Sequence, residues 1–341
     1  MDELRYSVVV PAYQAAAVIG QCVRALQQQT VVREEYEVIV TDDGSTDATA
    51  AIAREAGADR VLTIAHGGPA VARNVGIAAA RGEIILFTDA DCEPLTDWLA
   101  EMVRPFADPA VMGVKGVYRT RQREVIARLA QCEFEERYDL LERPQKIDFV
   151  DSHAAAFRAK ALRESGGFDP AFTQANNEDV DLSYRLARQG YTLLFNRQAI
   201  VYHRHPARWR VYLRLKARRG YWRMMVYRLH PGKALHDSYT PQLLKAQVIL
   251  VYGCLALGAG ALVRPALGWA AGAALGALGL SALPFTRLAA QRDAGVAMWA
   301  PLFVWARAVA FAVGVLAGLA GMVLFRRGLV ATIQGKAQPR A

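Results

Sequence analysis

The last third of the chain most constrains its fold, because it is almost uncharged over lengths that match a lipid bilayer. Leu243–Val263 and Ala266–Phe285 are each about 20 residues long, enough to cross a hydrocarbon core of about 30 Å as helices. A third apolar stretch, Val296–Phe325, is interrupted by Arg307. Three successive stretches of this kind are too long and too apolar for the buried helices of a soluble protein. The sequence therefore predicts an integral membrane protein with two or three spans.

Glycines in these stretches recur at a spacing that brings membrane helices together. Gly268, Gly272 and Gly276 lie four residues apart, and so do Gly314 and Gly318, which predicts close backbone contact between helices. The number of spans stays open. Three crossings would place the basic C-terminal tail outside, against the positive-inside tendency. Two crossings, with the last stretch re-entrant or interfacial, would keep that tail in the cytosol.

A basic belt precedes the apolar stretches. Ten residues between Arg204 and Lys233 are Lys or Arg and none is acidic, so this segment accounts for the net charge of +9. Trp and Tyr side chains are interleaved with these cations. Lys and Arg beside a span attract anionic headgroups, and Trp and Tyr prefer the interface. Because no nucleic-acid-binding motif accompanies the belt, we expect interfacial helices that either anchor the chain or also contact substrate, and no nucleic acid partner.

The residues before the belt alternate short apolar strands with amphipathic helices. The expected strands are Ser7–Val10, Glu37–Val40 and Ile84–Phe87, and the expected helices are Ala17–Gln28, Asp47–Ala56 and Ala70–Ala80. This alternation predicts an α/β domain with a mostly parallel sheet covered on both faces. The four cysteines lie far apart without a Cys-x-x-Cys pair, which indicates neither disulfides nor a zinc site. The start of the chain does not have the pattern of a signal peptide, so we expect the domain to fold in the cytosol.

Carboxylates follow two of the predicted strands. Asp42 and Asp43 end one strand, and Asp89 and Asp91 come directly after another. Ligands of open parallel sheets bind beyond the carboxyl ends of the strands. Asp89 and Asp91 can converge there on a hard divalent cation, which would relieve their mutual repulsion. The alternative for an isolated Asp-x-Asp is a solvated acidic turn.

An ordered set of motifs over about residues 5–205 resembles glycosyltransferase family 2, the large inverting group with the GT-A fold. The motifs are Val10-Pro11-Ala12-Tyr13, Thr41-Asp42-Asp43-Gly44-Ser45-Thr46-Asp47, Ala72-Arg73-Asn74-Val75-Gly76, Asp89-Ala90-Asp91, Gly166-Gly167-Phe168-Asp169 and Glu178-Asp179-Val180-Asp181-Leu182. The belt and the apolar tail also look like the membrane-bound branch typified by ExoA-type enzymes of exopolysaccharide assembly. The resemblance implies a Rossmann-like GT-A catalytic domain over residues 1–202. Interfacial helices over 203–241, transmembrane helices over 242–327 and a tail over 328–341 would follow.

The resemblance implies roles for residues on the donor side. The nucleotide base would be bound by Pro11, Ala12 and Tyr13, together with Asp42 or Asp43 and Arg73. Asp89 would face the ribose, and Asp91 would hold Mn²⁺ or Mg²⁺ against the diphosphate. His203 is a candidate further ligand of the metal, although a structural histidine at a strand end is the equal alternative. Such a cation stabilises the negative charge that develops on a departing nucleoside diphosphate.

The resemblance also implies roles on the acceptor side. Asp179 would be the general base that takes the proton from an incoming hydroxyl, with Glu178 beside it in the catalytic pair. The alternative is that these acidic residues only complement a helix dipole. Further candidates for contact with the acceptor or the diphosphate are His153, Arg218, Arg219 and Trp222. The Arg218-Arg219-Gly220-Tyr221-Trp222 segment departs from the Gln-x-x-Arg-Trp element of processive synthases, which argues against processivity.

These observations together predict a metal-dependent inverting hexosyltransferase at the cytosolic face of the cytoplasmic membrane, with multiple membrane passes. It would move a sugar from a nucleotide-sugar, with a UDP-sugar favoured, to a lipid-linked polyprenyl-type acceptor in glycan or polysaccharide biosynthesis. One alternative is a polyprenyl-phosphate sugar synthase, whose acceptor is the lipid phosphate itself. The other is a catalytically silent membrane scaffold. The sequence leaves open whether the protein forms a homo-oligomer.

Overall fold

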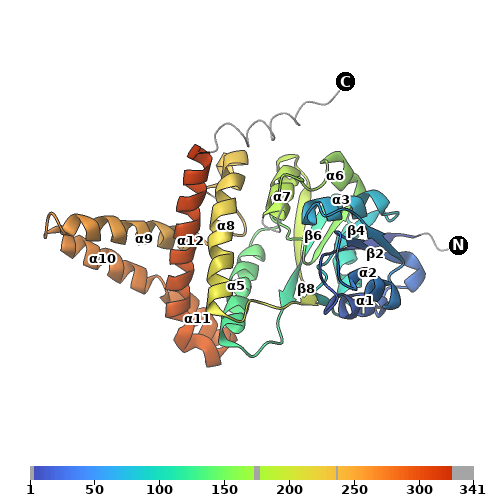
Figure 1. The fold of residues 1–341 in the computed structure, drawn as a ribbon, viewed down its shortest axis with the longest axis horizontal. Helices are drawn as coiled ribbons and strands as arrows, with labels where there is room; N and C mark the ends of the chain where they lie inside the picture. The colour runs from blue at the N-terminus through green and yellow to red at the C-terminus, as the bar shows by residue number, and fades with distance from the viewer. Residues whose placement is uncertain (1–3, 173–176, 236, 325–341) are drawn as a thin grey trace, which may run out of the picture. The chain divides into compact units, whose positions relative to one another are not determined.

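The computed structural model describes residues 4–172, 177–235 and 237–324, and the predicted tail over 328–341 lies outside them (Figure 1). The chain divides into two compact units. The sheet unit consists of Met1–Arg121 and Leu141–Arg204, and the helical unit consists of Gln122–Leu140 and His205–Ala341. This division differs from the expected linear one. A segment from within the expected catalytic domain, Gln122–Leu140, is part of the same unit as the C-terminal helices.

The sheet unit is built on a sheet of eight strands in the order β3-β2-β1-β4-β7-β6-β8-β5. The strands are β1 Tyr6–Ala12, β2 Tyr36–Asp42, β3 Arg60–Thr63, β4 Ile84–Phe87, β5 Glu93–Pro94, β6 Val111–Arg119, β7 Ala155–Arg158 and β8 Thr192–Tyr202. β1 pairs in parallel with β2 and β4, β2 with β3, and β6 with β8. β7 is antiparallel to β4 and β6, and β5 is antiparallel to β8. The predicted mostly parallel sheet is therefore confirmed.

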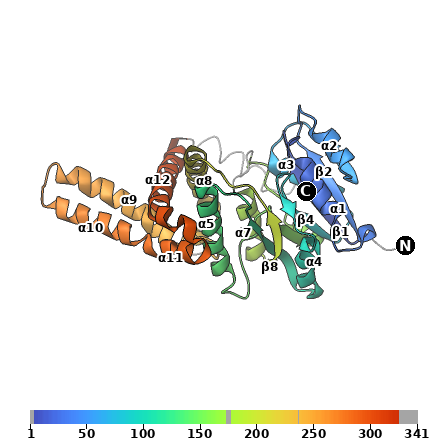
Figure 2. The same ribbon diagram turned by 90° about the horizontal axis from the view of Figure 1, so that it is seen from below.

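The central strands of this sheet are apolar along most of their length, and helices cover them. β2 and β4 are buried along their whole length, as the near-continuous apolar runs predict. The helices are α1 Ile19–Gln27, α2 Thr49–Glu55, α3 Pro69–Ala79, α4 Trp98–Val103, α6 Ala159–Glu164 and α7 Glu178–Arg188, with 3₁₀ turns at Arg33–Glu35 and Arg104–Ala107 (Figures 1 and 2). α3 approaches β1 closely, since a Cβ on Gly76 would lie 2.2 Å from Cγ1 of Val9. The three helices that the sequence predicts here are confirmed as α1, α2 and α3.

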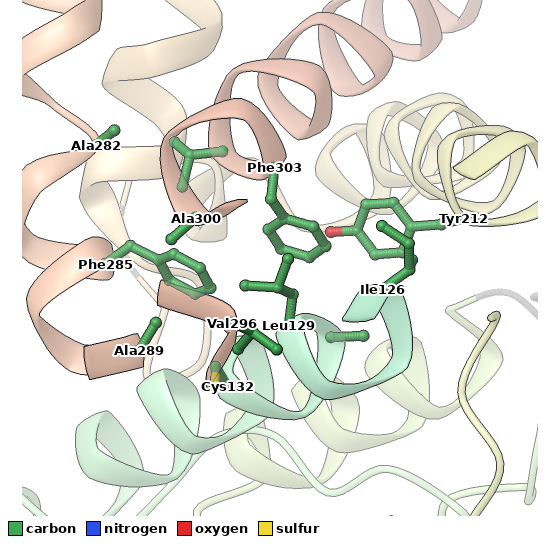
Figure 3. Packing of buried hydrophobic residues seen from close by; sticks show 12 residues of the cluster. Ile126, Leu129, Cys132, Tyr212, Ala282, Phe285, Ala289, Val296, Ala300 and Phe303 are labelled. Atoms are coloured by element: carbon green, nitrogen blue, oxygen red, sulfur yellow. The ribbon is translucent and has the colours of Figure 1, made fainter. Parts of the chain in front are cut away.

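The helical unit has a core of its own, formed where α5 meets the C-terminal helices. Its helices are α5 Val125–Leu141, α8 Trp209–Leu229, α9 Gln242–Ala261, α10 Leu267–Leu280, α11 Leu283–Arg292 and α12 Ala300–Leu324, with 3₁₀ turns at Pro231–Lys233 and Ala294–Trp299. Figure 3 shows Leu129 of α5 among the aromatic rings of Tyr212, Phe285 and Phe303. The ring of Phe303 lies 4.7 Å from that of Tyr212 and 5.7 Å from that of Phe285, between centroids. This apolar core explains why α5 belongs with helices that are distant in sequence.

The basic belt forms one long helix, α8, followed by a single 3₁₀ turn, where the sequence predicted a pair of interfacial helices. α8 packs tightly along α12. A Cβ on Gly314 would lie 1.9 Å from the carbonyl oxygen of Ala217, and one on Gly220 would lie 2.7 Å from that of Phe311. The prediction of close contact through Gly314 is thus correct, but the partner is the basic helix. The spacing at 268, 272 and 276 has no such role in the described residues, because open space surrounds those positions.

Three segments are long and apolar enough to cross a membrane by length and composition: Gln242–Ala261, Leu267–Arg292 and Ala294–Met322. The second is not one continuous helix, because α10 and α11 are separated at Ser281 and Ala282. α9 and α10 carry exposed apolar side chains along much of their length, including Ile249, Leu255, Trp269 and Leu275. Arg307 within the third segment is buried beside two carboxylates of α5, with distances of 3.9 Å to Glu133 and 3.7 Å to Glu136.

Candidate active site

The ends of β1 and β2 form one wall of the candidate site. These strands pair in register, with Pro11 opposite Thr41 and Ala12 opposite Asp42, so the predicted base-binding residues of both loops lie at one sheet edge. Asp42 is buried, and its Oδ1 accepts a hydrogen bond from the backbone N–H of Ser45 at 3.1 Å. Asp42 therefore fixes the turn that follows β2.

Asp43 shapes the loop that leads into α3. Its buried carboxylate accepts hydrogen bonds from the backbone N–H groups of Gly67, at 2.8 Å, and Gly68, at 2.9 Å. Gly68 has φ 92°, a conformation that glycine adopts without steric cost. Nδ1 of His66 lies 2.9 Å from the second carboxylate oxygen. Asp43 thus holds His66 and the two glycines in place at the start of α3.

An aromatic pair stands beside Asp43. The ring of Tyr13 is 49% exposed and stacks on the ring of His66, with centroids 4.4 Å apart. The turn that carries Tyr13 is tied to the loop after β2, because the N–H of Gln14 donates to Oγ of Ser45 at 2.9 Å. An exposed aromatic face in such a position can stack on a planar base. Sequence reasoning missed His66, and the only signal for it was its place before the two glycines.

Arg73 joins two parts of the site through ion pairs, and its expected contact with the nucleotide base stays a prediction. Its buried guanidinium lies between two carboxylates, 3.0 Å from Oδ1 of Asp89 and 2.8 Å from Oε1 of Glu178. The guanidinium also lies 5.4 Å from the centroid of the Phe168 ring. Arg73 therefore links the Asp-x-Asp turn to the first turn of α7. Glu178 is in turn the ion-pair partner of Arg73, and its expected catalytic role stays a prediction.

Two histidines lie beside the Asp-x-Asp carboxylates. Nε2 of His153 is 3.4 Å from Oδ2 of Asp89, and Nε2 of His203 is 3.9 Å from Oδ2 of Asp91. The two imidazole rings are 5.1 Å apart between centroids, and both lie against the ring of Tyr118 in β6. Desolvation by the surrounding protein, and then the charge of Asp89, raise the pKa of the Asp91 carboxyl. A cation bound at this point would favour the ionised form of Asp91.

A divalent cation fits this set when a substrate supplies further ligands. Within the described ranges, no three His, Cys, Asp or Glu side chains are arranged to hold a metal by themselves. Asp91 and His203 nevertheless face one another, and Nδ1 of the neighbouring His153 is buried without a hydrogen-bond partner. Mg²⁺ sites at substrate phosphates commonly take one or two carboxylates and complete their coordination with phosphate oxygens and water. The donor set is of that kind.

Asp179 lies in the first turn of α7, next to Glu178. Burial, and then the charges of Glu178 and Asp151, raise the pKa of Asp179 to about 6. Asp151 is itself buried and pairs with Lys115 of β6 at 2.6 Å. A carboxylate with a raised pKa can take up a proton near neutral pH, as a general base must. Glu178 and Asp179 therefore differ in role, since the first neutralises Arg73 and the second has its charged form destabilised.

The remaining predicted residues lie in the helical unit. Arg218, Arg219 and Trp222 all belong to α8, where the ring of Trp222 lies edge-on to that of Tyr221 at 5.6 Å. Arg218 is exposed. Their contact with an acceptor or a diphosphate stays a prediction.

A GT-A-type glycosyltransferase has this sheet topology, with acidic residues at the strand ends and further carboxylates at the start of the helix α7. The family model for glycosyl transferase family 2 matches residues 7–166. The glycosyltransferase AglE of Haloferax volcanii is 30% identical over 214 residues, an alignment that covers 59% of this chain and 67% of that protein. The chain belongs to glycosyltransferase family 2, as its motifs predict.

Two further similarities extend beyond the catalytic motifs. The pre-mycofactocin glycosyltransferase of Mycobacterium tuberculosis is 28% identical over 269 residues, which cover 74% of this chain and 53% of that protein. This chain thus spans about half the length of that relative. The solved structure of the mannosyltransferase PcManGT from Pyrobaculum calidifontis, in complex with GDP-Man and Mn²⁺, covers 93% of this chain and 87% of its own, at 25% identity and a TM-score of 0.59.

Proposed function

We propose that this protein is a membrane-anchored, metal-dependent inverting glycosyltransferase that moves a sugar from a nucleotide-sugar to a lipid-linked acceptor. The observation that carries the proposal is the contrast within the first turn of α7, where Glu178 is paired with Arg73 while the pKa of Asp179 is raised. That contrast supplies a base beside the Asp-x-Asp turn. The mannosyltransferase with bound GDP-Man and Mn²⁺ supports both a nucleotide-sugar donor and a divalent cation.

The residues of the sheet unit have distinct tasks under this proposal. The exposed ring of Tyr13 stacks on the nucleotide base, and Asp43 keeps His66 behind that ring. Asp91 and His203 hold the cation, which stabilises the negative charge of the departing diphosphate when bound. Arg73 orients Asp89 and keeps it ionised through their ion pair.

Asp179 takes the proton from the acceptor hydroxyl as that oxygen attacks the anomeric carbon of the sugar. The carboxylate has to be ionised to accept this proton, and a pKa of about 6 leaves most of it ionised at pH 7. One in-line displacement of the nucleoside diphosphate then inverts the configuration of the sugar. A lipid phosphate is already ionised as an acceptor and needs no base, so a functional Asp179 favours a hydroxyl acceptor.

We propose that the hairpin of α9 and α10 anchors the protein in the cytoplasmic membrane, with the sheet unit in the cytosol. α12 is paired with α8 from Phe303, beside Tyr212, to Gly321, where an added Cβ would lie 3.2 Å from the Tyr221 hydroxyl. α8 carries seven Lys and Arg residues, which are costly within hydrocarbon. This pairing favours two crossings, with α8 and α12 at the interface and the basic tail in the cytosol.

The test is release of nucleoside diphosphate by the detergent-purified full chain with Mn²⁺. UDP-, GDP- and dTDP-sugars are supplied in turn, with and without a polyprenyl-diphosphate-linked sugar as acceptor. Release from one donor that rises with the acceptor, is lost in Asp91→Ala and persists in the exposed control Asp97→Asn supports the proposal. Full activity of Asp179→Asn points instead to a lipid phosphate acceptor. If the wild-type chain shows neither release nor Mn²⁺-dependent nucleotide binding, the proposal is overturned and the silent scaffold is favoured.

A further inference from the structure

The helical unit contains a cavity of about 480 Å³ that none of the roles above uses. α8, the start of α9, α12 and the connection between α8 and α9 line it, together with one residue of α5. Arg137, Arg223 and Lys245 are its charged lining residues, and no described residue in the lining is acidic. The hydroxyl-bearing residues Tyr227 and Tyr239 also line it, so several residues that can donate hydrogen bonds surround one space.

The rest of the cavity wall is apolar and continues onto the outer surface of the hairpin. Met224 of α8, Val248 and Ile249 of α9, and Phe311 and Val315 of α12 are among the apolar lining residues. Ile249 is 69% exposed, so this wall is continuous with the surface of α9 that we propose to face lipid. A ligand that fills the cavity can therefore extend an apolar portion toward the membrane.

Buried cations of the same unit lie directly behind the lining. Arg137 donates to the hydroxyl oxygen of Tyr239 at 3.0 Å and to Oε1 of Glu133 at 2.6 Å. Glu133 also accepts from Lys216 at 2.8 Å and has Arg307 at 3.9 Å. One buried carboxylate thus serves three cations, with Glu136 near Arg307 as the other acidic side chain of the group. Burial lowers the pKa of Lys216, so the positive charge that an anion in the cavity would meet comes mainly from the lining residues Arg137, Arg223 and Lys245.

The cation near the hairpin base is only partly compensated. Nζ of Lys245 lies 3.6 Å from Oδ2 of Asp237 and donates to the carbonyl oxygen of Leu235 at 3.1 Å. Lys245 is in the first turn of α9, where anionic lipid headgroups would lie if α9 enters the bilayer. Val248 and Ile249 follow one turn deeper along the same helix. Along α9, the cation of Lys245 therefore comes before the apolar Val248 and Ile249. The phosphate and the chain of a lipid in the membrane lie in the same order.

We propose that this cavity binds the phosphate end and the first part of the chain of a polyprenyl-phosphate-type lipid. Arg223, Arg137 and Lys245 bind the phosphate, and the wall formed by α9 and α12 binds the isoprenoid chain. We choose a single-chain lipid because the lining has one cationic end and one apolar wall. The inference deepens the proposed function, on which it rests for the idea that this lipid carries or is the acceptor.

The test is binding of radiolabelled farnesyl phosphate to the full chain in detergent, with unlabelled compounds as competitors. Farnesyl phosphate should compete at least tenfold better than farnesol or inorganic phosphate, because both parts of the cavity contribute. Equal competition by farnesol would show that no anion is recognised and would overturn the proposal. Equal competition by phosphatidylglycerol would also overturn it, since the cavity would then be a general headgroup site.

Variants of the lining test the location of the site. Arg223→Gln should weaken binding of farnesyl phosphate about tenfold through the loss of a charged hydrogen-bond donor. Ala246→Trp, which adds a ring at an exposed position of the lining, should weaken it at least as much. Arg228→Gln removes an exposed cation of α8 outside the lining and should change binding less than twofold. Wild-type affinity in both lining variants would overturn the proposal.

A second readout separates this inference from the proposed function. Mn²⁺-dependent nucleotide binding belongs to the sheet unit and should be unchanged in Arg223→Gln and Ala246→Trp. Sugar transfer to a lipid acceptor that is unaffected by these variants would overturn the cavity assignment and leave the glycosyltransferase proposal intact. Farnesyl phosphate binding that depends on the lining, in a chain without nucleotide binding, would support the cavity and overturn the proposed function.

Discussion

Replacement of Arg73 should destabilise the sheet unit strongly, because its guanidinium separates two carboxylates in a buried setting. The side chains of Arg73 and Glu178 are 3% and 4% exposed, so water cannot replace their interaction. Removing one partner of a buried ion pair costs about 3–5 kcal/mol, much of it from the charge left behind. With a change of about 2–4 °C in Tm per kcal/mol for a unit of this size, Arg73→Met should lower Tm by roughly 10 °C.

The same reasoning predicts that a second substitution restores part of the loss. In Arg73→Met/Glu178→Gln, the unpaired buried charge of Glu178 is removed, so Tm should recover by several degrees relative to the single variant. The assay is thermal unfolding of the purified chain in detergent, followed through the signal of the sheet unit. Arg104→Gln is the matched control. It breaks an exposed pair with Glu101 and should cost less than about 1 kcal/mol. A single variant at position 73 that unfolds no earlier than this control would refute the reasoning.

Further predictions test the general base Asp179, the proposed metal ligand Asp91 and the contact between α8 and α12. The pKa of Asp179 is raised to about 6, so the rate of sugar transfer should fall as pH drops below about 6, because the base becomes protonated. Asp179→Asn should lower kcat by about 10²-fold or more and remove this acidic limb of the pH–rate profile. A folded-state pKa above the unfolded value also means that stability is lost as pH rises through about 6, so Asp179→Asn should raise Tm at pH 7 relative to the wild type. Asp91→Ala should abolish the rise in Tm that the nucleoside diphosphate of the active donor produces with Mn²⁺ in the wild type. The Tm without ligand should change little because Asp91 is 41% exposed. Gly314→Val should destabilise the helical unit by about 1–3 kcal/mol or prevent its folding, since its Cβ would lie 1.9 Å from a backbone oxygen, whereas Gly272→Ala in open space should be neutral in the same unfolding assay.

The strands, the first three helices and the acidic strand ends could be predicted because each depends on a local pattern. Apolar runs of four to seven residues that end at Pro or Asp define β1, β2 and β4 whatever the rest of the chain does. The Asp-x-Asp turn is likewise readable because it follows β4 directly. The family also followed from the order of its motifs.

Residue partners across long stretches of chain could not be predicted. Arg73 pairs with Glu178, 105 residues away, whereas the family resemblance implied only its place at the nucleotide base. His66 escaped notice since its role depends on a stacking partner from another loop, Tyr13. The membership of α5 in the helical unit depends on an apolar core shared with α11 and α12, and no local signal in α5 indicates those partners.

By itself, the sequence determined the α/β fold class, the carboxylates at the strand ends, the basic belt and the apolar stretches long enough to cross a membrane. These features follow from periodicity, charge and length, which can be read from residues that are close together in the sequence. Only the tertiary structure decided which carboxylate neutralises Arg73, which one has a raised pKa, and which surface of α12 is covered by α8. The physical reason is that desolvation and charge pairing depend on distance in space, and distant segments come within 3 Å of one another only after the chain has folded.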